Sequence, residues 1–317
     1  MNSFTLAVNV FNGGLLFKET LQSIEKVFHH FNEVFISITK TANYLNDLES
    51  CNSYNIPNIR INLFNKEGCT IHFINTISEL NTDFVLFLGH DDICHEDGII
   101  EAIKMLNISD TSNCVYGSNN ILLNNKLIKQ RIIKEKELVS ISDFINLRIK
   151  SEFYINVSGI FNSVRNLKKS IPLMKLNNES YWLDMLAITT PFTDYVQQTE
   201  YPITTIRMHE NQMSNNVNDF TSYCKDGIWF HLIFSLSNFD LSFHQSTIKE
   251  VNRLGSYINN KVFIFYYLTL LFKIIFSSHR YNPFYFILNL LNIMKMISIN
   301  SKNSIIIILG KLRLLGQ

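Results

Sequence analysis

Several motifs that define common enzyme classes are missing from this chain of 317 residues. There is no P-loop and no GxGxxG fingerprint, so kinase-like and dinucleotide-dependent chemistry lacks support. There is also no GxSxG motif and no paired Cys/His arrangement, which leaves acyl transfer without its usual nucleophile. The five cysteines are odd in number and none forms a CxxC pair. This argues against a disulfide framework or a structural zinc site and for buried or idle thiols in a reducing compartment.

Acidic residues are absent from the last part of the chain. After Glu250 there is no Asp or Glu, whereas eight Lys and Arg residues follow. Residues 1–250 carry the other 20 basic residues and all 27 acids, a formal charge of −7. An acidic body with a basic, aromatic-rich tail favours an anionic membrane surface as a partner. Nucleic acid is not expected as a partner, because the basic residues are spread among apolar runs and not clustered.

No apolar run of the tail is long enough to span a membrane. The uncharged runs at 262–272 and 281–294 fall short of the eighteen or so residues of a spanning helix. They suit helices lying at a membrane interface, with aromatic side chains near the headgroups. The aromatic residues expected there are Trp229, Tyr266, Tyr267, Tyr281 and Tyr285. The alternative is a helical subdomain that packs on the rest of the chain or across a dimer interface.

Strands and helices alternate over the first part of the chain. Strands are predicted at 4–11, 33–38, 58–64 and 83–88, with an alternating strand near 114–123, and amphipathic helices at 16–31, 71–80 and 99–106. This alternation predicts an α/β fold with a doubly wound, mainly parallel sheet. The opening residues lack a basic stretch and a cleavage-like site, so we expect a first strand and no signal peptide. We divide the chain into residues 1–225 and a helical region, 226–317.

Asp91 and Asp92 are the strongest chemical signal in the sequence. They follow a predicted buried strand directly, so they face the crevice in which an α/β sheet binds its ligand. Adjacent carboxylates repel each other unless a cation joins them, and hard oxygen ligands suit Mg²⁺ or Mn²⁺ bound to substrate phosphates. Such an ion would stabilise the charge on a departing diphosphate. The structural alternative is that the pair caps the helix expected near Asp97.

From residue 4 to about residue 215, the chain resembles the family 2 glycosyltransferases with the A-type fold. The matching segments are Phe11-Asn12, LQSI at 21–24, residues 65–75, FVLFLGHDD at 84–92 and IRMHENQMS at 206–214. The resemblance is greatest to bacterial enzymes of surface-polysaccharide assembly, such as O-antigen or capsule. It implies a Rossmann-like domain, a nucleotide-sugar donor, a divalent ion held by an Asp-x-Asp element, and an inverting displacement.

The resemblance also implies roles for individual residues of the donor site. Asp91 matches the last Asp of the Asp-x-Asp element, so it is expected to contact the metal and the donor, with Asp92 beside it. Phe11 and Asn12 fall where the first loop of the family meets the nucleotide. Asn75, at the end of the matching stretch 65–75, is placed in the same site.

Two positions depart from the family pattern. The first Asp of the triplet is Gly89 here, so one usual contact with the ribose or the metal is missing. The family commonly has an Asp after the second strand that reads the nucleobase, whereas this chain has Thr39 and Thr41. Thr39 is the substitute that we include in the donor site.

Inverting transfer requires a carboxylate that takes the proton from the acceptor hydroxyl as it attacks. Glu179 and Asp184 are the candidates, in the segment NESYWLDML at 178–186. The segment around Asp184 resembles the helix that presents the catalytic Asp in the family, so Asp184 is the preferred base. An acid on a solvated helix face is the ordinary explanation for either residue.

Arg207, His209 and Ser214 follow a predicted alternating strand at 203–206. A cation and an imidazole at this place could bind the diphosphate as it leaves. An Arg-x-His pair is common by chance. Its position in the family pattern is what makes a functional role more credible.

Taken together, the sequence predicts a metal-dependent, inverting glycosyltransferase at the cytoplasmic face of the cell membrane. Its partners would be a nucleotide-sugar donor, a lipid-linked glycan acceptor and anionic lipid. The alternative is a catalytically silent protein of the same fold that binds a sugar or nucleotide, and Gly89 is the feature that favours it.

Overall fold

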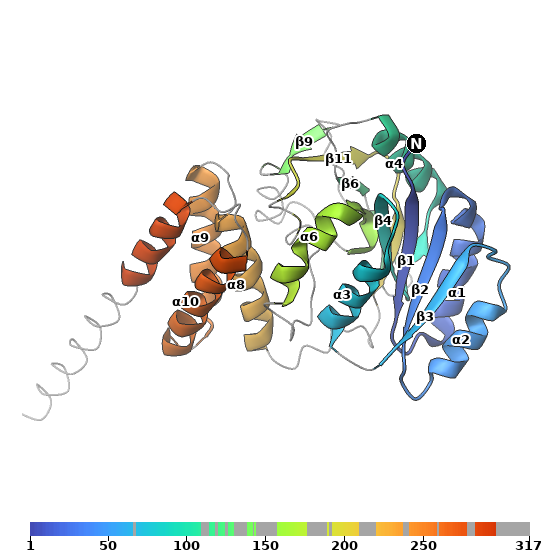
Figure 1. Ribbon diagram of the computed structural model, residues 1–317, viewed down its shortest axis with the longest axis horizontal. Coiled ribbons are helices and arrows are strands. Elements are labelled where there is room, and N and C mark those ends of the chain that lie inside the picture. The colour runs from blue at the N-terminus through green and yellow to red at the C-terminus, as the bar shows by residue number, and fades with distance from the viewer. Residues whose placement is uncertain are drawn as a thin grey trace, which may run out of the picture.

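The computed structural model places an α/β part beside a set of C-terminal helices (Figure 1). It describes residues 1–65, 68–108, 114–117, 120–123, 126–129, 138–141, 143, 157–175, 189, 192–208, 220–236, 241–258, 260–277 and 283–295.

The α/β part is built on an eight-stranded sheet with the order β3-β2-β1-β4-β10-β6-β11-β9. Its strands are β1 (Phe4–Val10), β2 (Glu33–Thr39), β3 (Ile59–Phe64), β4 (Phe84–Gly89), β6 (Cys114–Gly117), β9 (Leu138–Ser140), β10 (Ile160–Ser163) and β11 (Tyr195–Thr199). β1 pairs in parallel with β2 and β4, whereas β10 runs antiparallel between β4 and β6. The predicted mainly parallel sheet is therefore confirmed.

Helices cover both faces of this sheet. They are α1 (Gly14–Val27), α2 (Tyr44–Asn52), α3 (Cys69–Glu79), α4 (Glu96–Ile108) and α6 (Val164–Met174). Successive residues of a strand point to opposite faces, so Ala7 and Phe87 pack in the cluster that includes α3 and α6. Leu6 and Val8 pack in a second cluster with α1 and α4. The near-continuous apolar strands follow from burial on both faces.

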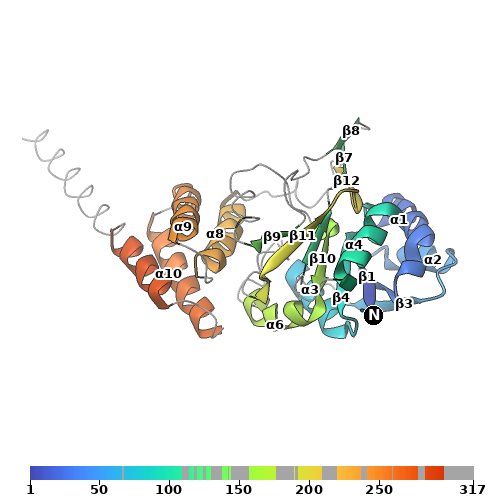
Figure 2. The same ribbon diagram turned by 90° about the horizontal axis from the view of Figure 1, so that it is seen from above.

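A smaller sheet has the order β5-β12-β7-β8 and projects from the large one (Figure 2). Its strands are β5 (Ile93–Cys94), β12 (Thr204–Met208), β7 (Asn120–Leu123) and β8 (Lys126–Lys129). The single strand predicted at 114–123 is wrong, because β6 pairs with β10 and β11 whereas β7 pairs with β12 and β8. β12 matters for the site, since it brings Arg207 next to the end of β4.

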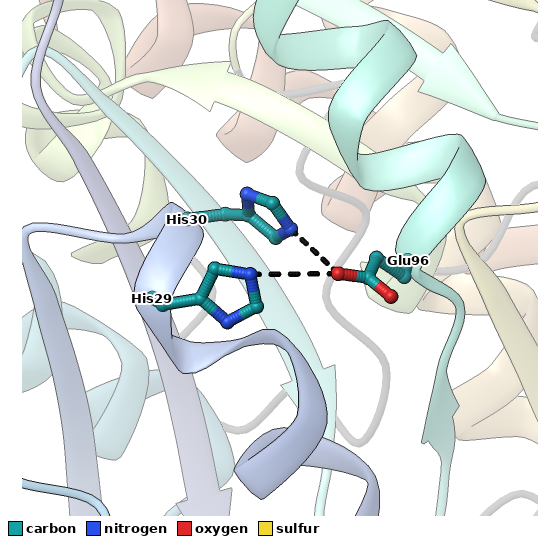
Figure 3. Close-up of side chains that lie close together, drawn as sticks. All are labelled: His29, His30 and Glu96. Atoms are coloured by element: carbon teal, nitrogen blue, oxygen red, sulfur yellow. Dashed lines mark hydrogen bonds and ion pairs between the residues drawn. The ribbon is translucent and has the colours of Figure 1, made fainter.

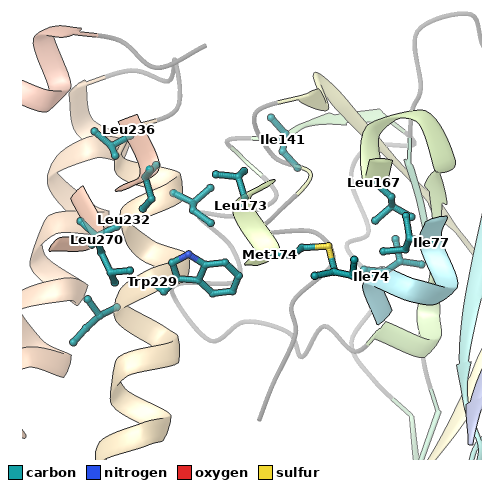
Figure 4. Packing of buried hydrophobic residues seen from close by; sticks show 14 of the residues in the cluster. Ile74, Ile77, Ile141, Leu167, Leu173, Met174, Trp229, Leu232, Leu236 and Leu270 are labelled. Atoms are coloured by element: carbon teal, nitrogen blue, oxygen red, sulfur yellow. The ribbon is translucent and has the colours of Figure 1, made fainter. Parts of the chain in front are cut away.

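The C-terminal helices are α8 (Phe220–Leu236), α9 (Leu241–Gly255), α10 (Asn260–Ser277) and a helix over residues 283–295. Trp229 on α8 is fully buried and belongs to the same apolar cluster as Leu173 and Met174 of α6 (Figure 4). The predicted boundary at residue 226 therefore falls inside α8, and the helices share a core with the α3–α6 face of the sheet.

This packing corrects the expected position of several aromatic side chains. Trp229, Tyr267 and Tyr285 are buried among the helices, so they are not available to lipid headgroups. The Tyr267 hydroxyl donates a hydrogen bond to Asn289 Oδ1 at 2.6 Å, which satisfies it inside the core. Tyr266 is half-buried, and Tyr281 lies outside the described residues. The packed helical subdomain, which was the alternative interpretation, describes these residues better.

The helix over residues 283–295 nevertheless keeps an apolar outer face. Tyr285, Asn289 and Ile293 point inward and are buried. Its exposed large apolar residues are Phe284, Ile287, Leu291 and Met294, at successive spacings of three, four and three residues. Such spacing places them along one side of the helix. Among the described residues, no helix is long and apolar enough to cross a membrane.

Candidate active site at the carboxyl end of β4

Asp92 lies in the turn that follows β4, and its side chain is only 3% exposed. The turn is closed by a hydrogen bond from Asp92 N–H to Gly89 O, at 3.0 Å. One carboxylate oxygen, Oδ1, accepts from the backbone N–H of Arg207 at 3.1 Å. The other, Oδ2, accepts from the Ser158 hydroxyl, which itself accepts from Gly89 N–H at 2.9 Å. Asp92 therefore ties β4 to β12 and to the turn before β10.

The electrostatic setting of Asp92 is unfavourable for a charge. Burial, followed by repulsion from Asp91, raises the pKa of Asp92 well above its usual range, while the bonds from Ser158 and Arg207 partly oppose this shift. Asp91, by contrast, is half-buried at the mouth of the turn. The first turn of α4 already carries Glu96 and Asp97. The structure thus gives Asp92 partners other than the helix terminus considered as the alternative.

Gly89 makes room for both carboxylates. A Cβ atom built at this position would lie 2.6 Å from Asp92 Oδ2 and 2.8 Å from Asp91 Oδ1. Both distances are far shorter than real contacts allow, so any side chain at this position would force the carboxylates to move. The two carboxylates can therefore lie close over the end of β4 only because position 89, where the family triplet has its first Asp, is a glycine.

Arg207 on β12 is buried, and its guanidinium points toward α1. Its Nη2 donates to Leu16 O at 2.7 Å and to Thr20 Oγ1 at 3.1 Å. Its Nε donates to Asp91 O, and Nη1 pairs with the carboxylate of Glu19. The guanidinium is thus surrounded by protein partners. The contact with a diphosphate that the sequence predicts for Arg207 stays a prediction.

Thr20 completes the link between α1 and the acidic turn. Its hydroxyl lies 2.9 Å from His90 O and 2.8 Å from Asp92 O. The hydroxyl has a single proton, so it can donate to one of these carbonyls at a time, while the Arg207 guanidinium contacts Asp91 O. Such support on regular elements holds a site more firmly than a loop alone would.

The first loop, after β1, contains Phe11 and Asn12 as predicted. Asn12 is exposed and has a φ of 53°, a left-handed conformation that Asn tolerates better than most residues. The buried carboxylate of Asp47, on α2, accepts from Gly13 N–H and Gly14 N–H, both at 3.2 Å. A negative charge at a helix N-terminus is favourable. The start of α1 is thus already filled by an anion of the protein itself.

Thr39 lies at the carboxyl end of β2 and is buried. Its hydroxyl lies 2.9 Å from His72 Nδ1, on α3, and the other ring nitrogen bonds Ser37. Burial lowers the pKa of His72 to about 4, so the ring is neutral near pH 7. Thr76 donates to Asn9 Oδ1 at 3.0 Å and extends this polar network to β1. Asn75 is half-buried on the same helix.

Several predicted residues lie outside the described part of the chain. They are the two candidate bases, Asp184 and Glu179, together with His209 and Ser214. Of the others, the structure brings Asp91, Asp92 and Arg207 together at the end of β4, and it places Thr39 at the carboxyl end of β2. These four residues lie at the carboxyl edge of the parallel strands, as expected for a doubly wound sheet. Asn75 lies in the middle of α3.

Sequence reasoning missed the residues that support the site. Ser158, Glu19 and Thr20 hold the acidic turn, and Asp47 and His72 hold the neighbouring loops. Each acts across a long sequence separation, such as 66 residues between Ser158 and Asp92. No local sequence pattern indicates such contacts.

The comparisons with known proteins bear on the fold. Neither a protein-family model nor a curated protein matches the sequence. The structure is similar to the crystal structure of S. aureus TarS residues 1–349 with UDP-GlcNAc, with a TM-score of 0.61, 14% identity, and 87% and 81% of the two chains covered. The complex of the same TarS fragment with UDP gives a TM-score of 0.58 at the same identity and coverage. The predicted A-type glycosyltransferase fold is thus confirmed.

Replacing Gly89 by Ala is expected to destabilise the protein by roughly 1–3 kcal/mol, because the new methyl group overpacks the turn against two carboxylates. Urea unfolding would measure the loss. The matched control is the same substitution combined with Asp92→Ala, in which the closest oxygen is gone and the two effects should not add. An equal cost of Gly89→Ala in both backgrounds would contradict this explanation.

Proposed function

We propose that this chain is a glycosyltransferase that moves a sugar, with inversion, from a nucleotide-sugar donor to a glycan acceptor in surface-polysaccharide assembly. The observation that carries the proposal is the Asp91–Asp92 turn at the carboxyl end of β4, in a fold shared with TarS, which has been crystallised with UDP-GlcNAc and with UDP. A nucleotide diphosphate would lie over this turn, between the ends of β1 and β4.

The carboxylate oxygens at the turn are suitable ligands for a hard divalent cation. Both carboxylates approach one point above Gly89, and the charge of Asp91 disfavours that of Asp92, which is the situation that a cation relieves. We assign direct contact to Asp91, which is half-buried, with Asp92 beside it and oriented by Ser158 and the backbone N–H of Arg207. Mn²⁺ or Mg²⁺ at this place would supply positive charge to the departing diphosphate.

Polar groups beside the turn offer further contacts for the nucleotide. Asn9 Nδ2, Thr41 Oγ1 and Thr70 Oγ1 are buried and have no hydrogen-bond partner within the described part of the chain. They lie at the ends of β1 and β2 and in the first turn of α3. Buried polar atoms normally have partners, so a nucleobase or ribose could satisfy them after a small movement. Thr39, held by His72, would then border the base.

The chemical step requires a base on the acceptor side. The acceptor oxygen would attack the anomeric carbon, its proton would pass to a carboxylate, and the bond from the anomeric carbon to the diphosphate would break. We assign the proton to Asp184, with Glu179 as the second candidate. Arg207 is proposed as a positioning residue that fixes the Asp91 carbonyl against α1.

We further propose a lipid-linked acceptor and attachment to the inner face of the cell membrane. The support is the exposed apolar stripe of Phe284, Ile287, Leu291 and Met294, which lies in the acid-free, basic part of the chain. Apolar side chains on a short helix can insert at an interface while basic residues attract anionic headgroups. The enzyme would thereby stay where a lipid-linked acceptor is confined.

A second candidate function is a catalytically silent protein that binds a nucleotide or nucleotide sugar. Gly89 favours it, because the usual first acid of the triplet is absent and cannot be restored without displacing its neighbours. Donor hydrolysis separates the two functions, since a silent protein would bind the donor but would not cleave it.

Asp91→Asn is expected to abolish transfer and Mn²⁺-dependent binding of nucleotide sugars, because an amide is a poor ligand for a hard cation. A thermal-shift screen of nucleotide sugars, with and without Mn²⁺, followed by a transfer assay would measure both. Asp97→Asn, which removes an exposed acid from the first turn of α4, is the matched control and should leave both unchanged. Full activity in excess EDTA would refute the role of the metal.

Asp184→Asn is expected to reduce turnover by about 10²–10⁴-fold, because a positioned general base contributes that much. Donor affinity should hardly change, since the base touches the acceptor. Steady-state kinetics with Glu179→Gln as the comparison would assign the base. If Glu179→Gln were inactive and Asp184→Asn remained active, Glu179 would take the role.

Changing Phe284, Ile287, Leu291 and Met294 together to Gln is expected to release the protein from anionic vesicles. These side chains are exposed, so the fold should persist, which circular dichroism can verify. The matched control changes Leu45 and Ile108, two exposed apolar residues of the α/β part, to Gln. Binding to anionic vesicles, measured by co-sedimentation, should also weaken with salt, because exposed charges are screened. Unchanged binding of the fourfold variant would exclude this stripe as the anchor.

A further inference from the structure

His29, His30 and Glu96, none of which belongs to the acidic turn, form a cluster in which His29 and Glu96 are exposed (Figure 3). The two histidines end the short helix η1 (Phe28–His30), just before β2, and Glu96 begins α4. Their three ligand atoms lie within 4.8 Å of one another. Figure 3 shows that both imidazole rings are directed at the same carboxylate oxygen.

We propose that His29, His30 and Glu96 bind a transition-metal ion of the Zn²⁺ class. Two imidazole nitrogens and one carboxylate oxygen are the ligand types that Zn²⁺ takes in open sites, with a fourth position left to water. Imidazole ligands select Zn²⁺, Co²⁺ or Ni²⁺ over Mg²⁺ and Mn²⁺, which prefer oxygen. This inference is independent of the proposed function and concerns a different ion.

The distances suit a single tetrahedral ion. Bonds of about 2.0–2.1 Å at a tetrahedral centre place neighbouring ligand atoms roughly 3.4 Å apart. His29 Nε2 lies 3.5 Å from Glu96 Oε1, and His30 Nε2 lies 2.9 Å from the same oxygen. The second contact is a hydrogen bond. A metal would break it and would increase the distance between these two atoms by about half an ångström. The ring centroids of the two histidines are 4.0 Å apart.

The site is accessible from solvent. The side chains of His29 and Glu96 are 53% and 48% exposed, so an ion can enter directly. A metal ligand must be deprotonated before it binds, so an ion would replace the hydrogen bond between His30 Nε2 and Glu96 Oε1.

The backbone on both sides of the cluster is fixed. Asn58 Nδ2 donates to Phe28 O and Phe31 O, at 3.3 and 2.8 Å, which ties η1 to the start of β3. On the other side, Cys94 N–H donates to Ser23 Oγ at 3.1 Å, and His95 N–H donates to Ile203 O at 2.9 Å. The ligands are thus held before the metal arrives, which lowers the entropic cost of binding.

A metal at this place would join the end of α1 to the start of α4. The segment between Asp92 and Glu96 runs beside α1, which also supports the acidic turn through Thr20. Binding would therefore stabilise the folded chain and the arrangement of α1 against β5. It would do so without contact with Asp91.

Titration of the EDTA-treated full chain with Zn²⁺ by calorimetry tests the proposal. One equivalent of Zn²⁺ should bind and raise the midpoint of thermal unfolding, whereas Mg²⁺ should do neither at this site. Co²⁺ should give visible d–d absorption typical of nitrogen and oxygen ligands. His30→Ala and Glu96→Gln should each weaken Zn²⁺ affinity by at least about tenfold.

Asp97→Asn is the matched control, since it removes the same charge from the same helix terminus without touching the cluster. Its Zn²⁺ affinity should equal that of the original chain. Absence of Zn²⁺ binding would overturn the proposal and leave a surface hydrogen bond and ion pair. Binding that is unaffected in both His30→Ala and Glu96→Gln would overturn it as well, because the ion would then lie elsewhere. Circular dichroism without metal shows that each variant is folded.

Discussion

The site depends on one buried polar network, in which Asp92 and Arg207 bind three separate segments to one another. Burying an ionisable group is costly unless it is hydrogen-bonded or paired. Here the Asp92 carboxylate accepts from Ser158 and from the backbone of Arg207, while the Arg207 guanidinium reaches Glu19, Thr20 and two backbone carbonyls of α1 and the turn. Removing one member would leave a buried partner unsatisfied, so β4, β12 and α1 are held as a unit.

This network gives the two acids of the turn different surroundings. Asp92 is buried among protein groups, whereas Asp91 is half-buried at the mouth of the turn and next to a like charge. The glycine before the pair allows the compact arrangement, since a Cβ there would collide with both carboxylates. The departure from the family triplet and the burial of Asp92 are thus two aspects of the same packing.

The C-terminal helices belong to the same physical unit as the sheet. Trp229 of α8 packs in one apolar cluster with Leu173 and Met174 of α6, and through α6 and α3 with the strands. The aromatic residues that could have been an interfacial belt are mostly used in this core. The outer face of the helix over residues 283–295 stays apolar and exposed, and Phe265 and Phe272 of α10 are exposed as well.

The sequence by itself determined the first four strands, the helices between most of them and the acidic pair at a strand end, because hydrophobic periodicity and turn residues act locally. It missed α2 and merged β6 with β7, since local apolarity cannot tell in which sheet a strand will pair. Tertiary structure alone decided that Arg207, 115 residues from Asp92, lies beside it and faces α1. It also decided that Trp229 is buried in the core and that the side chains of His29, His30 and Glu96 lie close together. Contacts over such separations follow from how whole elements pack, and no short segment of sequence carries that information.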